Sequence, residues 1–266
     1  MNYKFLNKFL AHNFTRFFPK TVNRKLLRRF KIFFVPTKFK ILPTFNYPIT
    51  TNLSEQKELV NKFRQINQII KFNTKKDMDI FLMKIFKKKK FNYFDIGGEY
   101  IDLYLKLNNV LNIDRYYLHN LDGIIDIFQD LKKHFNFKNL YPIKKITKLP
   151  KIDFVYFGST IQYFSNYKLF LRKIFKIKPK YIFFSGTTCF EDKKINDTIV
   201  VKQTNILPHT HYLYFFNFNN FTQFFKKNGY KLHFKKKNKF ADINYTNFSP
   251  ELKKISYLDF LFVLKN

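Results

Sequence analysis

The chain has 266 residues, 45% of them hydrophobic, which is enough for one domain with an extension or for two small domains. Its 50 basic and 18 acidic residues give a formal net charge of +32, which favours an anionic partner such as nucleic acid, a phospholipid surface or a sugar phosphate. The single cysteine, Cys189, excludes an internal disulfide, and no apolar run is long enough for a transmembrane helix, so a cytoplasmic protein is expected.

Residues 1–90 are predicted to form a basic, mainly helical extension. The first acidic residue is Glu55, and before it Lys and Arg alternate with apolar residues at helical spacing. Basic amphipathic helices can lie on anionic membranes, so residues 1–40 are a candidate peripheral anchor at the inner face of the membrane. The alternative is that these helices pack on the following domain and expose a basic outer face. Further helices are expected after Ser54 and Thr74, both plausible N-cap residues.

From Phe91 onward, short apolar segments alternate with amphipathic ones. Repeated β-α-β units predict an α/β domain over residues 91–266, with a mainly parallel sheet and helices on both faces. Two helices are expected at residues 100–107 and 118–135. Two later helices are expected, one capped by Ser165 or Asn166 and one capped by Asn219 or Asn220. The predicted strands cover residues 93–96, 110–113, 140–143, 152–157, 181–184, 230–234 and 257–264.

The turn after the first predicted strand, Asp95-Ile96-Gly97-Gly98-Glu99, is the candidate ligand site. Open parallel sheets bind ligands at the carboxyl ends of their strands, and glycine lets the backbone approach a ligand closely. Asp114 is predicted to end the second strand, where a carboxylate can accept hydrogen bonds from a ribose diol. Asp95, Gly97, Gly98 and Asp114 together favour a nucleoside-bearing cofactor. The alternative is a simple tight turn followed by a helix N-cap at Asp114.

Several segments, in order, resemble class I S-adenosylmethionine-dependent methyltransferases. Residues 94–98 resemble the first motif of that family, residues 152–157 and 159–164 resemble its fourth strand and the segment after it, and residues 178–184 resemble the entry into its fifth strand. The resemblance covers about residues 91–266. It implies a Rossmann-like fold with a mainly parallel seven-stranded sheet, an antiparallel last strand and S-adenosylmethionine as cofactor.

Three further features resemble a family of methyltransferases encoded near surface-polysaccharide genes: Gln162-Tyr163, the segment 197–203 and the aromatic run 214–217. This narrower resemblance implies a sugar or surface-polysaccharide intermediate as the small-molecule or glycan acceptor. In the segment 159–164, Ser159 and Gln162 are further candidate cofactor contacts, and Gln162 and Tyr163 are also candidates to contact the acceptor.

The chain departs from these families at two positions. Glu99 stands where the family's turn has a further glycine, and its carboxylate is placed either to accept hydrogen bonds from the cofactor's ammonium group or to block the pocket. Lys144-Lys145 ends the third predicted strand, where the family often has an acidic residue that contacts the adenine amine.

A hydroxyl acceptor would require a general base, and His209 and His211 are the candidates because imidazole titrates near neutral pH. Either one taken singly is also explained as a loop or surface histidine. No Cys or His spacing predicts a metal site.

Two other functions remain open from the sequence. Glu99 and Lys144 are compatible with a non-catalytic binding module that has kept the fold and lost the cofactor. The charge and aromatic content are compatible with a nucleic-acid-binding protein or RNA methyltransferase, although Lys greatly outnumbers Arg, the residue preferred for bidentate phosphate recognition.

Overall fold

The computed structural model describes residues 34–38, 40–42, 56–58, 60–61, 76–86, 89–147, 149–191, 197–206, 209–238, 248 and 255–265. The predicted basic helices before residue 34, and the N-caps at Ser54 and Thr74, lie outside this set. Among the described helices, none is both long and apolar enough to cross a membrane.

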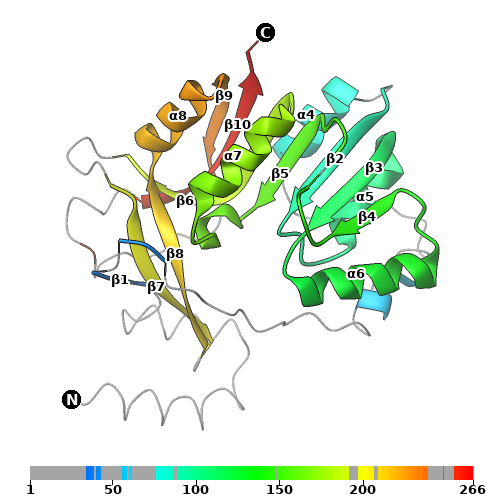
Figure 1. Ribbon diagram of the computed structural model, residues 1–266, viewed down its shortest axis with the longest axis horizontal. Helices are drawn as coiled ribbons and strands as arrows, with labels where there is room; N and C mark the ends of the chain where they lie inside the picture. The colour runs from blue at the N-terminus through cyan, green and yellow to red at the C-terminus, as the bar shows by residue number, and fades with distance from the viewer. Residues whose placement is uncertain are drawn as a thin grey trace.

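The centre of the molecule is a twisted, mainly parallel sheet (Figure 1). Its seven principal strands lie in the order β4-β3-β2-β5-β6-β10-β9, in which β10 runs antiparallel to both of its neighbours. This confirms the predicted Rossmann-like fold with an antiparallel last strand. The strands are β2 (Phe91–Ile96), β3 (Ile113–His119), β4 (Leu140–Ile143), β5 (Phe154–Gly158), β6 (Tyr181–Phe190), β9 (Tyr230–Lys237) and β10 (Ile255–Leu264).

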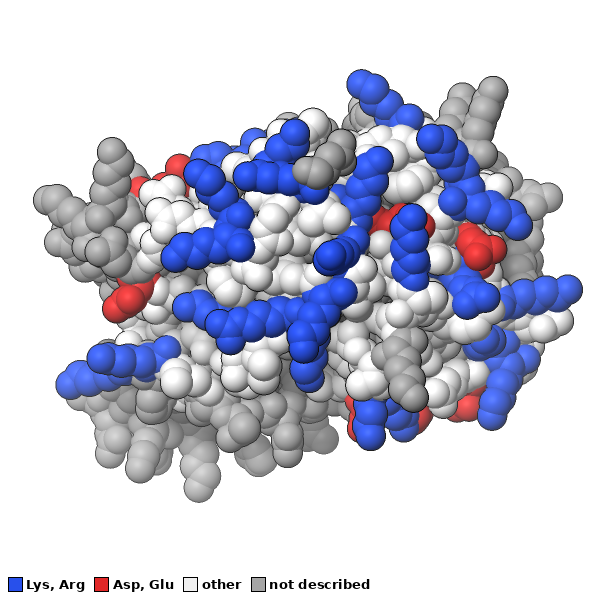
Figure 2. Space-filling model, turned by 45° about the horizontal axis from the view of Figure 1, so that its top comes forward, with Lys and Arg blue, Asp and Glu red and all other residues white. Residues whose placement is uncertain are grey.

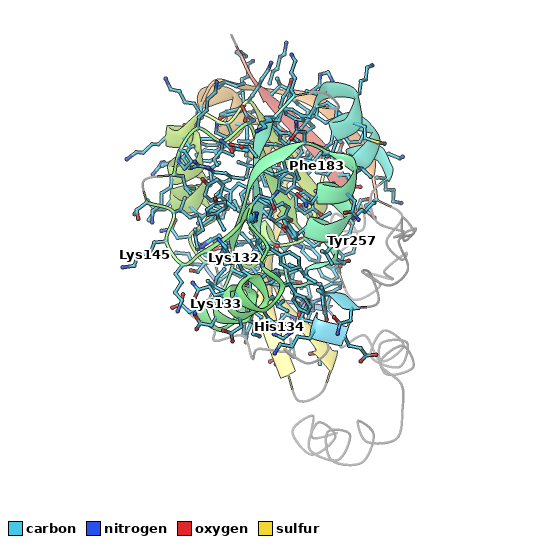
Figure 3. All side chains as sticks on the ribbon, turned by 90° about the vertical axis from the view of Figure 1, so that its right-hand side faces the viewer. Lys132, Lys133, His134, Lys145, Phe183 and Tyr257 are labelled. Carbon is cyan, nitrogen blue, oxygen red and sulfur yellow. The ribbon has the colours of Figure 1, made fainter. Side chains whose placement is uncertain are left out.

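Two apolar cores lie on the two faces of this sheet. One packs α7 (Tyr167–Ile177) and α8 (Phe218–Lys227) against the strands, and in Figure 1 these helices lie in front of the sheet. The other packs α4 (Lys76–Phe86), α5 (Asp102–Val110) and α6 (Asp122–Phe135) on the opposite face. Figure 3 looks along α6 toward its last turn, which carries Lys132, Lys133 and His134.

The helix boundaries follow local chemistry. The Asn166 side chain caps α7 by accepting a hydrogen bond from the Leu169 amide, as its position predicted. The predicted cap of α8 was wrong: Asn217, rather than Asn219 or Asn220, caps the helix by accepting a hydrogen bond from the Asn220 amide. Gly229 follows α8 with φ of +85°, the left-handed geometry that commonly ends a helix.

The second strand was predicted in the wrong place. Of the expected strand 110–113, Val110 is the last residue of α5 and Ile113 is the first residue of β3, which continues to His119. Leu118 was predicted to begin the next helix, and Tyr116 and Tyr117 were placed in no element, because these large side chains do not alternate in polarity. They are buried on both faces of β3, as expected for an interior parallel strand.

Three further strands extend the sheet beyond β6. The hairpin of β7 (Ile199–Ile206) and β8 (His209–Asn217) contains both the segment 197–203 and the aromatic run singled out in the sequence. β8 joins β6 through Cys189 and Phe190, and β1 (Phe34–Pro36) adds antiparallel to β7. β6 is therefore longer than the predicted strand 181–184, and it includes the buried Cys189.

Candidate functional site

The turn after β2 lies at the carboxyl edge of the sheet, where the order of strands reverses. β2 pairs with β3 on one side and with β5 on the other, so both neighbouring crossovers diverge at this turn. Gly97 has φ of +85°, and its amide donates a 2.8 Å hydrogen bond to the carbonyl of His119 at the end of β3. A Cβ at Gly97 would lie 2.1 Å from Oγ1 of Thr160, so glycine is required where the β5 loop packs on the turn.

Asp95 supports the turn from within the protein. Its carboxylate is 1% exposed, and its Oδ2 accepts a 2.7 Å hydrogen bond from the hydroxyl of Tyr116. A Cβ at Gly98 would lie only 2.4 Å from the same Oδ2. Gly98 is therefore explained by the space that the Asp95 carboxylate fills, and Asp95 acts as a positioning residue for the turn.

The end of β3 carries neutral side chains. Nδ1 of His119 lies 3.0 Å from the carbonyl oxygen of Ile143. Because a carbonyl oxygen can only accept, Nδ1 is the donor, and Nε2 of the neutral ring is left as an acceptor. Burial lowers the pKa of His119, although the hydrogen bond to Ile143 opposes the shift. Asn120 fastens the turn, because its Nδ2 donates to the Gly98 carbonyl at 2.8 Å.

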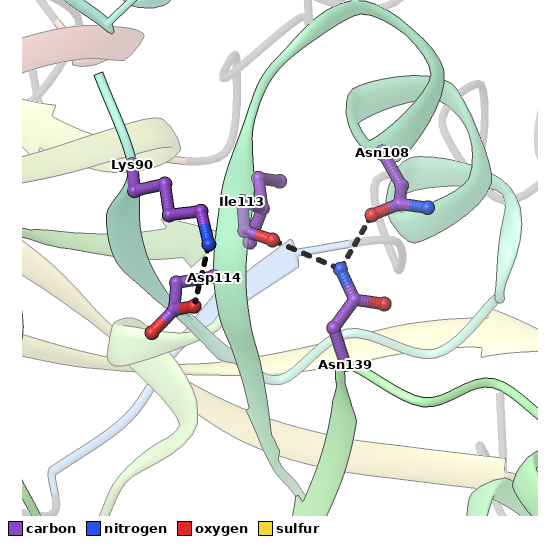
Figure 4. Close-up of polar contacts among 5 residues, drawn as sticks. All are labelled: Lys90, Asn108, Ile113, Asp114 and Asn139. Carbon is purple, nitrogen blue, oxygen red and sulfur yellow. Dashed lines mark hydrogen bonds and ion pairs between the residues drawn. The ribbon is translucent and has the colours of Figure 1, made fainter.

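Asp114 is at the opposite edge of the sheet. It is the second residue of β3 rather than the residue after the strand, so it lies far along the strand from the Gly97 turn. Its carboxylate is exposed and 4.0 Å from the ammonium of Lys90 (Figure 4). Its neighbour Ile113 accepts a hydrogen bond from Asn139, which also contacts Asn108. The prediction that Asp114 ends the second strand was wrong, and the structure does not bring it to the candidate site.

Gln56, which the sequence did not point to, fastens the other side of the turn. Its buried amide donates to the Glu99 carbonyl at 3.3 Å and accepts from the Ile101 amide at 3.2 Å. Glu99 is half-buried on this bridged segment. At the end of β4, Lys144 forms a 2.7 Å ion pair with Asp126, which raises the pKa of the exposed lysine.

A second polar group forms where the segment after β5 meets the β7–β8 hairpin. The Tyr163 hydroxyl donates to Oε1 of Gln203 at 2.9 Å, and the Tyr163 ring meets the buried His211 ring edge-on at 5.8 Å. Gln203 and His211 are also directly opposite each other in the β7–β8 ladder. The structure thus brings Tyr163 and His211 together. His209 begins β8, but its side chain is outside the described set.

Gln162 faces the middle of β6. It is 1% exposed, and its Nε2 donates to the carbonyl of Gly186 at 3.4 Å. Ser159, with φ of +55°, donates to the carbonyl of Ser185 through its amide at 2.7 Å and its hydroxyl at 3.2 Å. Within the described part of the chain, Oε1 of Gln162 and Oγ1 of Thr187 are buried without a hydrogen-bond partner. Such atoms are uncommon in folded proteins and mark a place for a donor from outside the chain.

Asp259 of β10 fixes the backbone that Gln162 contacts. Its Oδ1 accepts from the Ser185 hydroxyl at 2.8 Å, the Gly186 amide at 2.8 Å and the Asn238 amide nitrogen at 2.7 Å. The pairing of β10 with β6 shifts register at this point, and Gly186 has φ of +61°. Asp259 therefore holds a kink in β6 at Gly186, and the carbonyl of Gly186 accepts the hydrogen bond from the Gln162 side chain.

No protein-family model and no curated protein sequence matches this chain. The fold is similar to that of a Burkholderia thailandensis 1,6-didemethyltoxoflavin-N1-methyltransferase, solved with 1,6-didemethyltoxoflavin and S-adenosylhomocysteine, with a TM-score of 0.51 and 9% identity over 88% of this chain and 95% of that one. It is also similar to the [4+2]-cyclase SpnF, with a TM-score of 0.50 and 6% identity over 71% of this chain and 80% of that one.

These likenesses show the fold of the chain, which is the Rossmann-like fold of S-adenosylmethionine-dependent methyltransferases. A cyclase has a similar fold, so the fold alone does not determine the reaction. The reaction must be argued from the residues at the carboxyl edge.

Proposed function

We propose that this protein is an S-adenosylmethionine-dependent methyltransferase whose acceptor is the hydroxyl group of a sugar or surface-polysaccharide intermediate. The observation that carries the proposal is the position of the Gly97–Gly98 turn, at the carboxyl end of the strand where the sheet order reverses. The B. thailandensis enzyme with a similar fold was solved with S-adenosylhomocysteine, the product of this cofactor. The sugar acceptor is supported by the sequence resemblance at residues 162–163, 197–203 and 214–217.

The residues at this edge are chemically compatible with the cofactor. An ammonium group would satisfy the buried, unpartnered Oε1 of Gln162, and a ribose hydroxyl would find an acceptor in Nε2 of His119. The glycine turn and Asn120 would bound the site on the β2 side. When bound, S-adenosylmethionine supplies an activated methyl group, and the protein contributes mainly by holding the acceptor oxygen in line with it.

A hydroxyl acceptor loses its proton as it is methylated. His211 is buried beside Tyr163, so its imidazole is a proton acceptor shielded from bulk water. The Tyr163–Gln203 hydrogen bond fixes the tyrosine ring against which His211 packs. We assign His211 the role of general base and Tyr163 that of a positioning residue.

Titration calorimetry with S-adenosylmethionine and S-adenosylhomocysteine tests the cofactor assignment. The wild-type chain should bind both, and Gln162→Leu should weaken binding about tenfold or more, because it removes the buried acceptor. His211→Asn should leave cofactor affinity unchanged. Absence of binding to the folded wild-type protein at millimolar ligand would refute the assignment.

A non-catalytic binding module is the second candidate, favoured by two observations. The residue directly after β3 is Asn120 rather than a carboxylate, the first carboxylate beyond it being Asp122 at the start of α6, and Thr160 packs directly on Gly97. If the pocket has degenerated, Glu99→Gly should create cofactor binding that the parent lacks. If the site is functional, that variant should change an affinity that is already present.

A further inference from the structure

The lysines at the amino edge of the sheet form a row. Five neighbouring strands, β2, β5, β6, β10 and β9, each have one exposed lysine at this edge. Lys90 and Lys180 immediately precede β2 and β6, Lys151 comes shortly before β5, Lys265 follows the antiparallel β10, and Lys231 is near the start of β9. Since strands are about 4.8 Å apart, the row extends over roughly 19 Å. We call these five residues the lysine row.

Backbone hydrogen bonds hold the row in register. The Leu264 amide donates to the carbonyl of Lys180 at 3.0 Å, and the Lys265 amide donates to the carbonyl of Gly229 at 2.9 Å. The side chain of Asn92 donates to the carbonyl of Lys151 at 2.8 Å. These bonds tether the backbone of Lys151, Lys180 and Lys265 to neighbouring strands, and Lys231 lies within β9. Lys180, Lys231 and Lys265 also line one hollow at this edge, together with Val263 and Leu264.

The row has little compensating negative charge. At this edge of the described structure the carboxylates are Asp114, 4.0 Å from Lys90, and Asp153, which accepts from the Asn92 amide at 2.9 Å. Lys151, Lys180, Lys231 and Lys265 form no ion pair with any described carboxylate. Further exposed lysines flank the row at the helix ends: Lys133, Lys176, Lys178, Lys226 and Lys227.

Figure 2, in which the top of Figure 1 comes forward, shows lysine and arginine side chains spread across this face and few acidic ones. Lysines in the last turn of a helix are explained by the helix dipole. That explanation does not extend to the lysine row, which lies at strand ends. Like charges held this close favour a polyanion that neutralises several of them at once.

We propose that the lysine row is a docking surface for an anionic phospholipid membrane. The row contains no arginine to grip a single phosphate in bidentate fashion, and the exposed aromatic residues of the described chain, Tyr100 and Tyr163, lie at the opposite edge. Stacking on single-stranded nucleic acid thus has no platform here. An extended row of ammonium groups suits the diffuse negative charge of lipid headgroups, to which each lysine adds about fivefold in affinity.

This surface is distinct from residues 1–40, and it does not depend on the proposed methyl transfer. It would orient the Gly97 turn away from the bilayer, because the carboxyl and amino edges are on opposite sides of the sheet. The carboxyl edge would then face an acceptor in solution.

Co-sedimentation of the full chain with vesicles tests the proposal. Wild type should bind vesicles of phosphatidylcholine with phosphatidylserine and not vesicles of phosphatidylcholine alone. The triple variant Lys180→Glu, Lys231→Glu, Lys265→Glu should lose at least about tenfold in affinity. The control variant Lys145→Glu, Lys168→Glu, Lys173→Glu makes the same charge change on exposed residues elsewhere, and it should lose much less.

Equal losses in the two triple variants would overturn the proposal, because they would show a response to net charge alone. So would an unaffected row variant, which would place the contact elsewhere. The same proteins are titrated with polyuridine RNA: a row variant that loses RNA binding and retains vesicle binding would make nucleic acid the partner and reject the membrane. Circular dichroism confirms that each variant is folded.

Discussion

The hydroxyl of Tyr116 donates a 2.7 Å hydrogen bond to Oδ2 of Asp95, next to the Gly98 backbone. Both side chains are fully buried, so this bond holds a carboxylate inside the protein beside the turn that we assign to the cofactor. The bond links Asp95, two residues before Gly97, to Tyr116 in the middle of β3.

Tyr116→Phe should therefore destabilise the protein by about 1.5–3 kcal/mol, because the partner is a buried carboxylate. Tyr117→Phe is the matched control: its hydroxyl accepts only a 3.4 Å hydrogen bond from Arg115, and about 1 kcal/mol or less is expected. Urea unfolding measures both. Similar losses in the two variants would show that the Asp95 bond has no special weight.

Gly98→Ala should be strongly destabilising, because its Cβ would lie 2.4 Å from the Asp95 carboxylate. Much of that loss should disappear when Asp95 is also replaced by Ala, giving a coupling of about 1–3 kcal/mol in a double-mutant cycle. Gly98 lies outside the left-handed region, so its loss should come from the steric clash; Gly229→Ala, at φ of +85° with its Cβ meeting only Leu264 at 3.8 Å, shows the cost of backbone strain without a clash. Additive effects of the Gly98 and Asp95 changes would contradict the assigned contact.

Asp259→Ala should destabilise the protein by about 3 kcal/mol or more, because it leaves the donors from Ser185, Gly186 and Asn238 without their acceptor. Asp153→Ala, which removes a carboxylate that accepts from a single backbone amide, should cost about 1 kcal/mol. If thermal unfolding shows the two variants to be alike, Asp259 does not hold the β6 kink.

Gln56→Ala should loosen the segment between Glu99 and Ile101. The Ile101 amide donates to the Gln56 side chain, so its hydrogen exchange should become faster in the variant. The Leu105 amide, which donates to the Ile101 carbonyl within α5, should exchange as in wild type. Unchanged protection at Ile101 would mean that Gln56 does not hold the turn.

His119 should make part of the stability dependent on pH. Its pKa is lowered in the folded protein, so the unfolded chain takes up the proton first as pH falls below about 6.5. Stability is thus fully present above that pH and is lost as pH falls toward the folded-state pKa. His119→Gln should flatten this acid limb in urea unfolding measured on either side of that pH. An unaltered limb would show that His119 does not contribute.

The sequence was a good guide to the fold because each element left a local mark. The apolar strands are recognised from consecutive residues. Asn166 caps α7 through the Leu169 amide three residues later, and Gly229 directly follows the end of α8. β3 was misplaced because its buried residues are large on both faces, which removes the alternation that identifies a strand. That single error moved Asp114 into the predicted site and kept His119 and Asn120 out of it.

The site itself was only partly predictable. Gly97, Gly98 and Gln162 lie beside strand ends, where local sequence reveals them. Gln56 and Asp259 reach the site through contacts 43 to 45 and 73 to 74 residues away along the chain. Asp259 did leave a mark, as a lone carboxylate in an apolar strand. Gln56 left none, because an amide in a helical segment has no distinctive pattern.

Photochemical cross-linking of S-adenosylmethionine, followed by peptide mapping, tests the central claim most directly. The label should attach within residues 97–101 or 159–163 and should disappear when S-adenosylhomocysteine competes. Labelling that resists competition, or that maps to the hollow lined by Lys180, Lys231 and Lys265, would contradict a cofactor site at the carboxyl edge.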